Sequence, residues 1–324
     1  MAVRRSLLPG FAAFSTSAAL LLAACSGPGD GGSGGGGGSG GNLIEPAGPG
    51  SGGSAAVECK NVDILFVVDD SASMDDNQES LISSFPGFVS AIKEQLGGAE
   101  SYHIGVVTSD AYLYNEAGCT DIGDLVTKTG GAASSDSVCG PFGDGRRYMD
   151  ETDANLGAAF ACAAKVGVSG DDDERVARAL IQALDPQKNA PGGCNAGFSR
   201  LDSLLVVVII TDEDDAATID PGCPPDVPPI QCQKFGSGGM PLEWYDQVIA
   251  AKGGIPENVV VLSLLGKTKD NDCGADLASR LINFTGLFGT QGFTGDICAT
   301  SYDEFFAKVL PLVDDACAGY VEPK

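Results

Sequence analysis

The chain has 324 residues, eleven cysteines and one histidine, and its formal net charge is −25. A chain of this length can bury a large hydrophobic core. The excess of acidic side chains argues against nucleic acid and anionic lipid as direct ligands, and it favours interaction with cations.

The first residues carry the pattern of an export signal. Within residues 1–24, Arg4 and Arg5 precede an apolar stretch that contains Pro and Gly and is therefore a poor membrane span. The run "LAAC" that ends at Cys25 resembles the lipobox of bacterial lipoproteins. That resemblance implies cleavage before Cys25 and acylation of this residue, which would hold the protein on a membrane. Because Ser26 follows in place of Asp, we expect the outer membrane, at the cell surface or on its periplasmic face.

A tether and one domain are predicted beyond the signal. Residues 25–57 are the lipidated Cys and a Gly/Ser-rich stretch that cannot pack a core, and as a flexible coil they would reach on the order of 30 Å. Residues 58–324 are then the folded domain.

Apolar runs alternate with segments of helical periodicity along this domain. The predicted strands are 62–68, 102–110, 203–215 and 258–266, and the predicted helices are 77–96, 155–167, 174–184, 242–252, 275–284 and 301–317. Such alternation predicts an α/β fold with a doubly wound, mostly parallel, Rossmann-like sheet flanked by helices.

Two of the most apolar strands end on acids. "VDILFVV" is followed by Asp69 and Asp70, and "LLVVVIIT" is followed by "DEDD" at 212–215. Ligands of parallel sheets bind beyond the carboxyl ends of the strands, so we expect these acids to line one shared site.

The same two runs resemble the von Willebrand factor A (VWA) family over roughly residues 60–317. "VDILFVVDDSASM" is similar to its first strand and D-x-S-x-S metal-binding loop, with Asp69, Ser71 and Ser73 as the pattern residues, and "VVVIITDEDD" is similar to its fourth strand, with Asp212 as the distal aspartate. The family's metal-site Thr lies on a loop before a helix, and Thr152 matches it best. The resemblance implies a metal-ion-dependent adhesion site (MIDAS).

Such a ligand set suits a hard divalent cation, because hydroxyls and carboxylates supply oxygen ligands. The resemblance implies Mg²⁺, with Ca²⁺ or Mn²⁺ as alternatives, bound directly by Ser71 and Ser73 and through waters by Asp69 and Asp212. An ion held this way is open to a carboxylate from a protein partner. The alternative interpretation of "DDSAS" is a turn that caps the next helix.

Further acids near these motifs have two interpretations. Asp70, which stands where the family usually has Gly, could hold a second cation such as Ca²⁺ together with Glu213, Asp214 and Asp215, or the last three could be a solvated loop. The acids of 170–174 are expected to cap the helix that follows them, and metal binding there is the less favoured alternative.

Ten cysteines remain if Cys25 is acylated, and an even number in an exported chain indicates up to five disulfides. Zinc is disfavoured, because the chain has no C-x-x-C pair and a single His. The sequence alone does not choose among the pairings. Short separations favour Cys119–Cys139 and Cys223–Cys232, the meeting of chain ends in this fold favours Cys59–Cys317, and the remainder would be Cys162–Cys194 and Cys273–Cys298.

Three functional hypotheses follow. The first is a cell-envelope lipoprotein that binds a carboxylate-bearing protein partner through the metal site and touches the membrane only through its anchor. The second is a structural envelope protein whose cation site is vestigial. The third, a metal-dependent phosphotransfer enzyme, is disfavoured because Asp69 and Asp70 do not have the D-x-D spacing that the phosphatases need. A Ser or Cys hydrolase is disfavoured because the chain shows no second His and no nucleophile–base pair. We therefore expect no catalytic residues.

Overall fold

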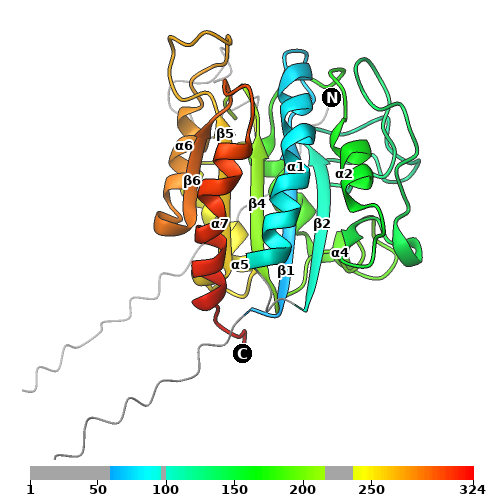
Figure 1. The fold of residues 1–324 in the computed structure, drawn as a ribbon, viewed down its shortest axis with the longest axis vertical. Coiled ribbons are helices and arrows are strands. Elements are labelled where there is room, and N and C mark those ends of the chain that lie inside the picture. The colour runs from blue at the N-terminus through cyan, green and yellow to red at the C-terminus, as the bar shows by residue number, and fades with distance from the viewer. Residues whose placement is uncertain (1–58, 96–99, 216–235) are drawn as a thin grey trace, which may run out of the picture. The chain divides into compact units, whose positions relative to one another are not determined.

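The sheet confirms the predicted α/β class. In the computed structural model, which describes residues 59–95, 100–215 and 236–324, the strand order is β3-β2-β1-β4-β5-β6 (Figure 1). All pairs are parallel except β2 with β3. The strands are β1 (Asn61–Val68), β2 (Ser101–Thr108), β3 (Met149–Asp150), β4 (Leu204–Ile210), β5 (Val259–Leu265) and β6 (Gly292–Asp296).

Helices connect these strands in the alternating way that the sequence predicts. They are α1 (Asp75–Gln95), α2 (Leu156–Ala164), α3 (Val176–Ala183), α4 (Pro186–Asn189), α5 (Pro241–Ala251), α6 (Ser279–Gly286) and α7 (Asp303–Ala318), with 3₁₀ turns at Gly143–Gly145, Pro256–Asn258 and Gly289–Gln291. The described residues all lie in one compact unit, Gly53–Lys324. The predicted signal, the tether, Cys25 and the pair Cys223–Cys232 lie outside the described residues and stay predictions.

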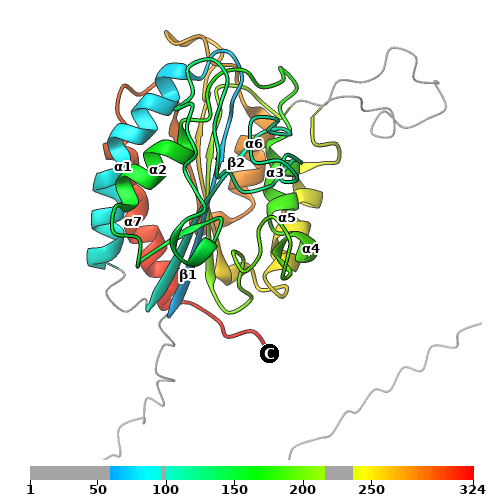
Figure 2. The same ribbon diagram turned by 90° about the vertical axis from the view of Figure 1, so that its right-hand side faces the viewer.

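Both faces of the sheet are covered, which explains why β1 and β4 are continuous apolar runs rather than alternating ones. Helices α1, α2 and α7 pack on one face and α3, α5 and α6 on the other (Figure 2). On the first face Phe66 of β1 lies against Phe160 of α2 with ring centroids 4.7 Å apart, and Phe160 stacks on Phe85 of α1 at 3.4 Å. These buried rings fix α1 and α2 over β1.

The register aligns the carboxyl ends of the three central strands. Val68, the last residue of β1, pairs with Thr108 of β2 and with Ile210 of β4. Asp69, Ser109 and Thr211 therefore leave the sheet side by side, and the loops that follow them build the candidate site.

The opposite, amino edge of the sheet holds an ion pair whose acid is fully buried. Asp63 of β1 accepts from the Arg200 guanidinium (Nη2–Oδ1 2.7 Å) and from the Ser203 hydroxyl (2.5 Å). The buried Lys252 ammonium donates to the Arg200 carbonyl and to Ser203 Oγ (2.9 Å). Here a buried acid is matched by positive side chains of the same chain, which offsets its desolvation.

Four disulfides join cysteines of the described residues. Cys59–Cys317 and Cys273–Cys298 are the pairs expected from the sequence. The expectation of Cys119–Cys139 and Cys162–Cys194 is wrong: Cys119 pairs with Cys194, and Cys139 pairs with Cys162. The error came from preferring short loops. The long excursion between β2 and β4 folds back on itself, so cysteines 75 residues apart become neighbours.

No helix in the described part of the chain is long and apolar enough to cross a membrane.

Peptide mapping without reduction should recover a fragment that joins Cys119 to Cys194 and another that joins Cys139 to Cys162. Replacing Cys119 and Cys194 by Ser should lower the free energy of unfolding by about 2–4 kcal/mol, because their bond closes a long loop. The same mapping tests the scheme directly, since a fragment that joins Cys119 to Cys139 would contradict it.

Candidate metal site

Asp69 lies at the end of β1 with both carboxylate oxygens occupied. It is fully buried. Oδ1 accepts from the Ser71 amide (2.7 Å), which closes a tight turn after the strand, and Oδ2 accepts from the Thr211 hydroxyl (2.6 Å) beyond β4. The Gln78 side chain of α1 donates to the Asp69 carbonyl (2.9 Å). The turn is thus tied to both neighbouring elements.

Four of the predicted ligands come together at this edge. The Ser71 and Ser73 hydroxyls lie 3.5 Å apart, and Ser73 Oγ donates to Asp212 Oδ1 (3.1 Å). Asp69 precedes these serines, and its carboxylate is within electrostatic reach of Asp212. We call Asp69, Ser71, Ser73 and Asp212 the central site.

The fifth predicted ligand, Thr152, is not part of it. Its hydroxyl donates to Asp150 Oδ1 (2.6 Å) in β3, and Asp150 pairs with His103, near the beginning of β2. The carboxyl end of β2 is five residues further on, which is roughly 16 Å along a strand. Thr152 therefore lies towards the amino edge of the sheet, and the expectation that it joins the metal site is wrong.

Glu174 lies beside the central site instead, on the loop before α3. Its side chain is only 3% exposed, and neither carboxylate oxygen has a hydrogen-bond partner among the described residues. Burial raises the pKa of its carboxyl, and the nearby Asp69 carboxylate raises it further. The Ser109 hydroxyl lowers this pKa, although its geometry is not that of a hydrogen bond.

Sequence reasoning missed Glu174 because two loops in this part of the chain precede a helix, and the resemblance alone did not tell which of them reaches the site. The search for a hydroxyl led to the loop before α2, whereas the loop that reaches the site precedes α3. The acidic run 170–174 was the available signal, but a run of acids before a helix also fits a cap.

The other acids after β4 cap helices rather than facing the central site. Asp215 accepts from the Ala177 amide at the start of α3 (2.8 Å) and from the Ser237 hydroxyl (2.5 Å). Asp214 accepts from the amides of Arg280 (3.0 Å) and Leu281 (3.1 Å) at the start of α6. Asp214 and Asp215 are therefore engaged at the starts of helices, and their part in a second cation site stays a prediction. The side-chain hydrogen bond to the start of α3 comes from Asp215, whereas the acids of 170–174 precede this helix in the chain.

A cleft of about 840 Å³ opens beside the central site. It is lined by Asp171, Asp172, Asp173, Glu174, Glu213, Asp214, Asp276, Leu277, Ser279 and one base, Lys269. Burial and the charges of Asp69 and Asp212 raise the pKa of Glu213 to about 7. Burial also raises the pKa of both Asp69 and Asp212, each opposed by the hydroxyls that bond it. The physical cause throughout is desolvation of carboxylates that lie near one another.

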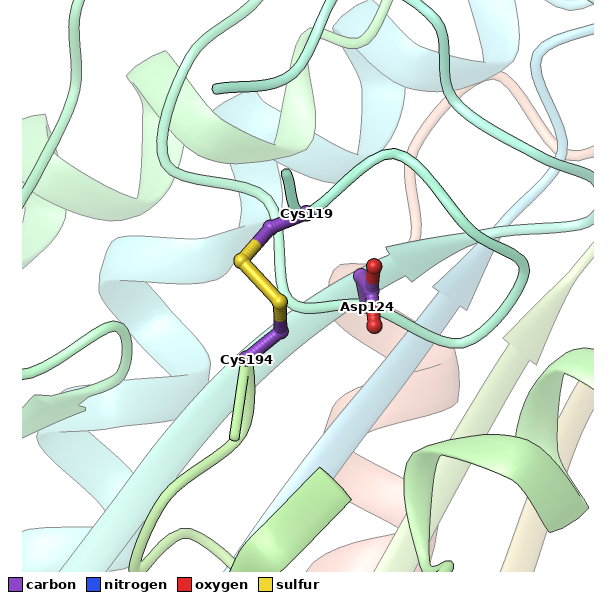
Figure 3. A group of neighbouring side chains, drawn as sticks. All are labelled: Cys119, Asp124 and Cys194. Carbon is purple, nitrogen blue, oxygen red and sulfur yellow. A yellow bond between two sulfur atoms is a disulfide. The ribbon is translucent and has the colours of Figure 1, made fainter. Parts of the chain in front are cut away.

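A separate group of possible metal ligands is already engaged. Cys119, Asp124 and Cys194 lie close together, but the two sulfurs form a disulfide (Figure 3). The Asp124 carboxylate accepts from the Lys188 ammonium and from the Asp121 amide (2.9 Å). No thiolate is left there to bind a metal.

No family model and no curated protein matches the chain. Among solved structures, a von Willebrand factor type A from Catenulispora acidiphila is 15% identical, with 78% of this chain and 42% of that one covered and a TM-score of 0.37. The pilus adhesin SpaC from Lactobacillus rhamnosus GG is 13% identical over 80% and 30% (TM-score 0.39), and proximal thread matrix protein 1 from the mussel byssus is 13% identical over 81% and 49% (TM-score 0.38).

The chain thus spans less than half the length of these structures. The family that the sequence motifs resemble is represented among them. Because the TM-scores are low, the likeness carries no argument about the site, and the fold rests on the strand order and register of the chain itself.

Without divalent cations, the protein should lose stability as the pH rises from about 6 to about 8. The folded-state pKa of Glu174 is raised by burial, so the native state retains a proton that the unfolded chain has released. Stability therefore falls with pH, by about 1.4 kcal/mol per pH unit for each such proton. Urea unfolding in chelator at several pH values measures this slope.

The matched variant is Glu174→Gln, which should flatten the slope. Burial lowers the pKa of His103, so this histidine acts in the opposite direction, but it does so equally in both proteins and cancels in the comparison. Equal slopes for the two proteins would contradict the assignment of the proton to Glu174.

Proposed function

We propose that this chain is an exported, lipid-anchored protein of the cell envelope whose folded domain binds a partner protein through a divalent cation at the central site. One observation carries this proposal. Buried carboxylates gather at the carboxyl edge of the sheet, and no ion pair joins Asp69, Glu174 or Asp212 within the described ranges, whereas Asp63 at the amino edge is paired with Arg200. A cation from solution would supply the missing positive charge.

The side chains present fit such an ion. Ser71 and Ser73 offer hydroxyl oxygens, and Asp69, Asp212 and Glu174 offer carboxylates. This all-oxygen set suits Mg²⁺, Mn²⁺ or Ca²⁺. Glu174 Oε1 and Oε2 are the least engaged of these atoms, since neither has a hydrogen-bond partner in the part of the chain described. A bound dication supplies local positive charge in an acidic environment.

This positive charge would attract the carboxylate of an acidic partner. The cleft beside the site is lined mostly by acids, so it would repel a carboxylate in the absence of the ion. With the ion in place, a carboxylate from the partner can complete its coordination. Binding of the partner should therefore depend on the cation and not only be strengthened by it.

Anchoring and export rest on other features. The "LAAC" run at Cys25 supports lipidation, and the four disulfides suit an oxidising compartment outside the cytoplasm. The absence of Asp after Cys25 supports the outer membrane, on its surface or periplasmic side.

We propose no catalytic role. His103 is the single histidine of the chain, and it lies in β2 on the amino-edge side, with Nδ1 2.9 Å from the Phe198 carbonyl. It is too far from the central site to act there as a general base.

Calorimetric titration of the purified domain with Mg²⁺, Mn²⁺ and Ca²⁺ tests the central site. Asp212→Asn should weaken the affinity for the best-bound ion at least about tenfold, because it removes a charged ligand. Thr152→Ala is the matched control and should leave the affinity unchanged, since Thr152 lies elsewhere. If none of the three ions binds, the proposal is wrong, and a structural envelope protein with a vestigial site is favoured.

Capture of envelope proteins on the immobilised domain tests the partner. A partner held through the ion should be retained in Mg²⁺ by the parent protein and by Thr152→Ala. It should be released by chelator and not retained by Asp212→Asn. A partner that stays bound in chelator would contradict cation-mediated binding while leaving the metal titration untouched.

A further inference from the structure

A second pocket lies beside the central site, on the side of β2. It has a volume of about 550 Å³, and we call it the side pocket. Its polar and aromatic lining consists of Asp70, Asp110, Tyr112, Tyr114, Ser169 and Arg175, with Asp171 at its border. Asp70 follows β1 and Asp110 follows β2, so two neighbouring strands each deliver one carboxylate to it.

Both carboxylates are buried, and one oxygen has no partner. Asp110 is only 6% exposed; its Oδ2 accepts from the Asp171 amide (2.9 Å), but its Oδ1 has no hydrogen-bond partner among the described residues. Asp70 is 2% exposed, and the Ser109 hydroxyl is 3.5 Å from its Oδ1. An unpartnered buried carboxylate oxygen beside a second buried carboxylate is costly unless something positive lies between them.

The chain's own positive group at this pocket, Arg175, lowers the pKa of Asp110 through its charge but forms no ion pair with it. Arg175 lines the pocket, yet its Nε donates to the Asp173 carbonyl (3.3 Å) and lies 3.6 Å from the Asp173 carboxylate. The remaining charged neighbours, Asp69, Asp171, Asp173 and Glu174, are acids. Within the described ranges, no ion pair joins Asp70 or Asp110.

We propose that the side pocket binds a divalent cation of its own, most suitably Ca²⁺, between the carboxylates of Asp70 and Asp110. This ion is distinct from the one at the central site, and it does not depend on that proposal. Ca²⁺ suits the pocket because it accepts several carboxylate, hydroxyl and carbonyl oxygens without strict octahedral geometry. The Ser109 and Ser169 hydroxyls lie near enough to contribute oxygens from the walls.

The loop that carries Glu174 is packed tightly against this pocket. The Gly170 amide donates to the Asp70 carbonyl (2.8 Å), and a Cβ at Gly170 would lie 2.6 Å from Asp70 Cγ. An ion bound between Asp70 and Asp110 would therefore hold this loop against the ends of β1 and β2. It would also hold Glu174 beside the central site.

Terbium(III), a luminescent substitute for Ca²⁺, provides a local readout because Tyr112 and Tyr114 line the pocket and can sensitise its emission. The chain has one tryptophan, Trp244, which packs against Phe284 on the other face of the sheet. Excitation of the tyrosines should give Tb³⁺ emission that Ca²⁺ displaces. Tyr114→Phe should reduce the emission while leaving the displacing Ca²⁺ concentration unchanged.

Variants separate the two ions. Asp110→Asn should weaken Tb³⁺ binding at the tyrosines at least tenfold, and Asp212→Asn should leave it within about twofold. Arg175→Gln should tighten it, because it removes a competing positive charge from the same pocket. Native mass spectrometry in Ca²⁺ should find one ion fewer on Asp110→Asn than on the parent protein. Circular dichroism and an intact disulfide count confirm that each variant is folded.

Two results would overturn the proposal. One is tyrosine-sensitised emission that Asp110→Asn and Asp70→Asn both leave unchanged. The other is a single bound Ca²⁺ on the parent protein that is lost in Asp212→Asn. In that second case the central site stands, and Arg175 neutralises the side pocket without an ion.

Discussion

The arrangement at the carboxyl edge of this sheet depends on one constraint: in the part of the chain that is described, its buried carboxylates have no positively charged partners, and their charge must be compensated. A charge removed from water costs several kcal/mol unless it is paired or loses its charge. At the amino edge of the sheet, the buried Asp63 is compensated by contacts with Arg200 and Ser203. At the carboxyl edge it places acids after β1, β2 and β4 and, in the described residues, provides no ion pair for those in the two pockets. Protonation is one way to neutralise them, as the raised pKa values of Asp69, Asp70 and Glu174 record, and a bound cation is the other.

The loops that surround these acids are held by covalent and polar contacts rather than by a core of their own. The segment between β2 and β4 contains long irregular loops beside β3, α2, α3 and α4, and Cys119–Cys194 and Cys139–Cys162 tie it at two places. Within it, the Tyr112 hydroxyl donates to the Val166 carbonyl (2.5 Å) and so joins the wall of the side pocket to the loop before α3. A segment fixed in this way can hold carboxylates at defined positions, which a solvated loop could not do, because each ordered residue costs conformational entropy.

Much of the fold follows from local signals in the sequence. β1 and β4 are continuous β-branched runs that only a sheet covered on both faces explains, and the acids after them lie at one edge because parallel strands end together. The sequence misses β6, since "GFTGD" is short, rich in Gly and only partly buried, and it misses β3, which has two residues. It also places Thr152 in the site and leaves Glu174 out, and it mispairs Cys119 and Cys139. The errors at Thr152, Glu174 and the two cysteines share one cause: they depend on how a long irregular loop folds back in space, and neither periodicity nor spacing carries that information.

Glu174 changes what an ion at the central site can do. A neutral hydroxyl at this position would leave the ion strongly electrophilic, so that it would readily bind a carboxylate from a partner. A third carboxylate beside Asp69 and Asp212 instead compensates the charge of a dication. The ion proposed for this site would then bind an acidic partner less tightly than it would beside a neutral hydroxyl, and protonation of Glu174 would strengthen that binding. The side pocket can influence the position of Glu174, because Gly170 packs against Asp70 and belongs to the same loop as Glu174. An ion between Asp70 and Asp110, as proposed above, would therefore affect how firmly Glu174 is held and, through Glu174, how open an ion at the central site would be to a partner.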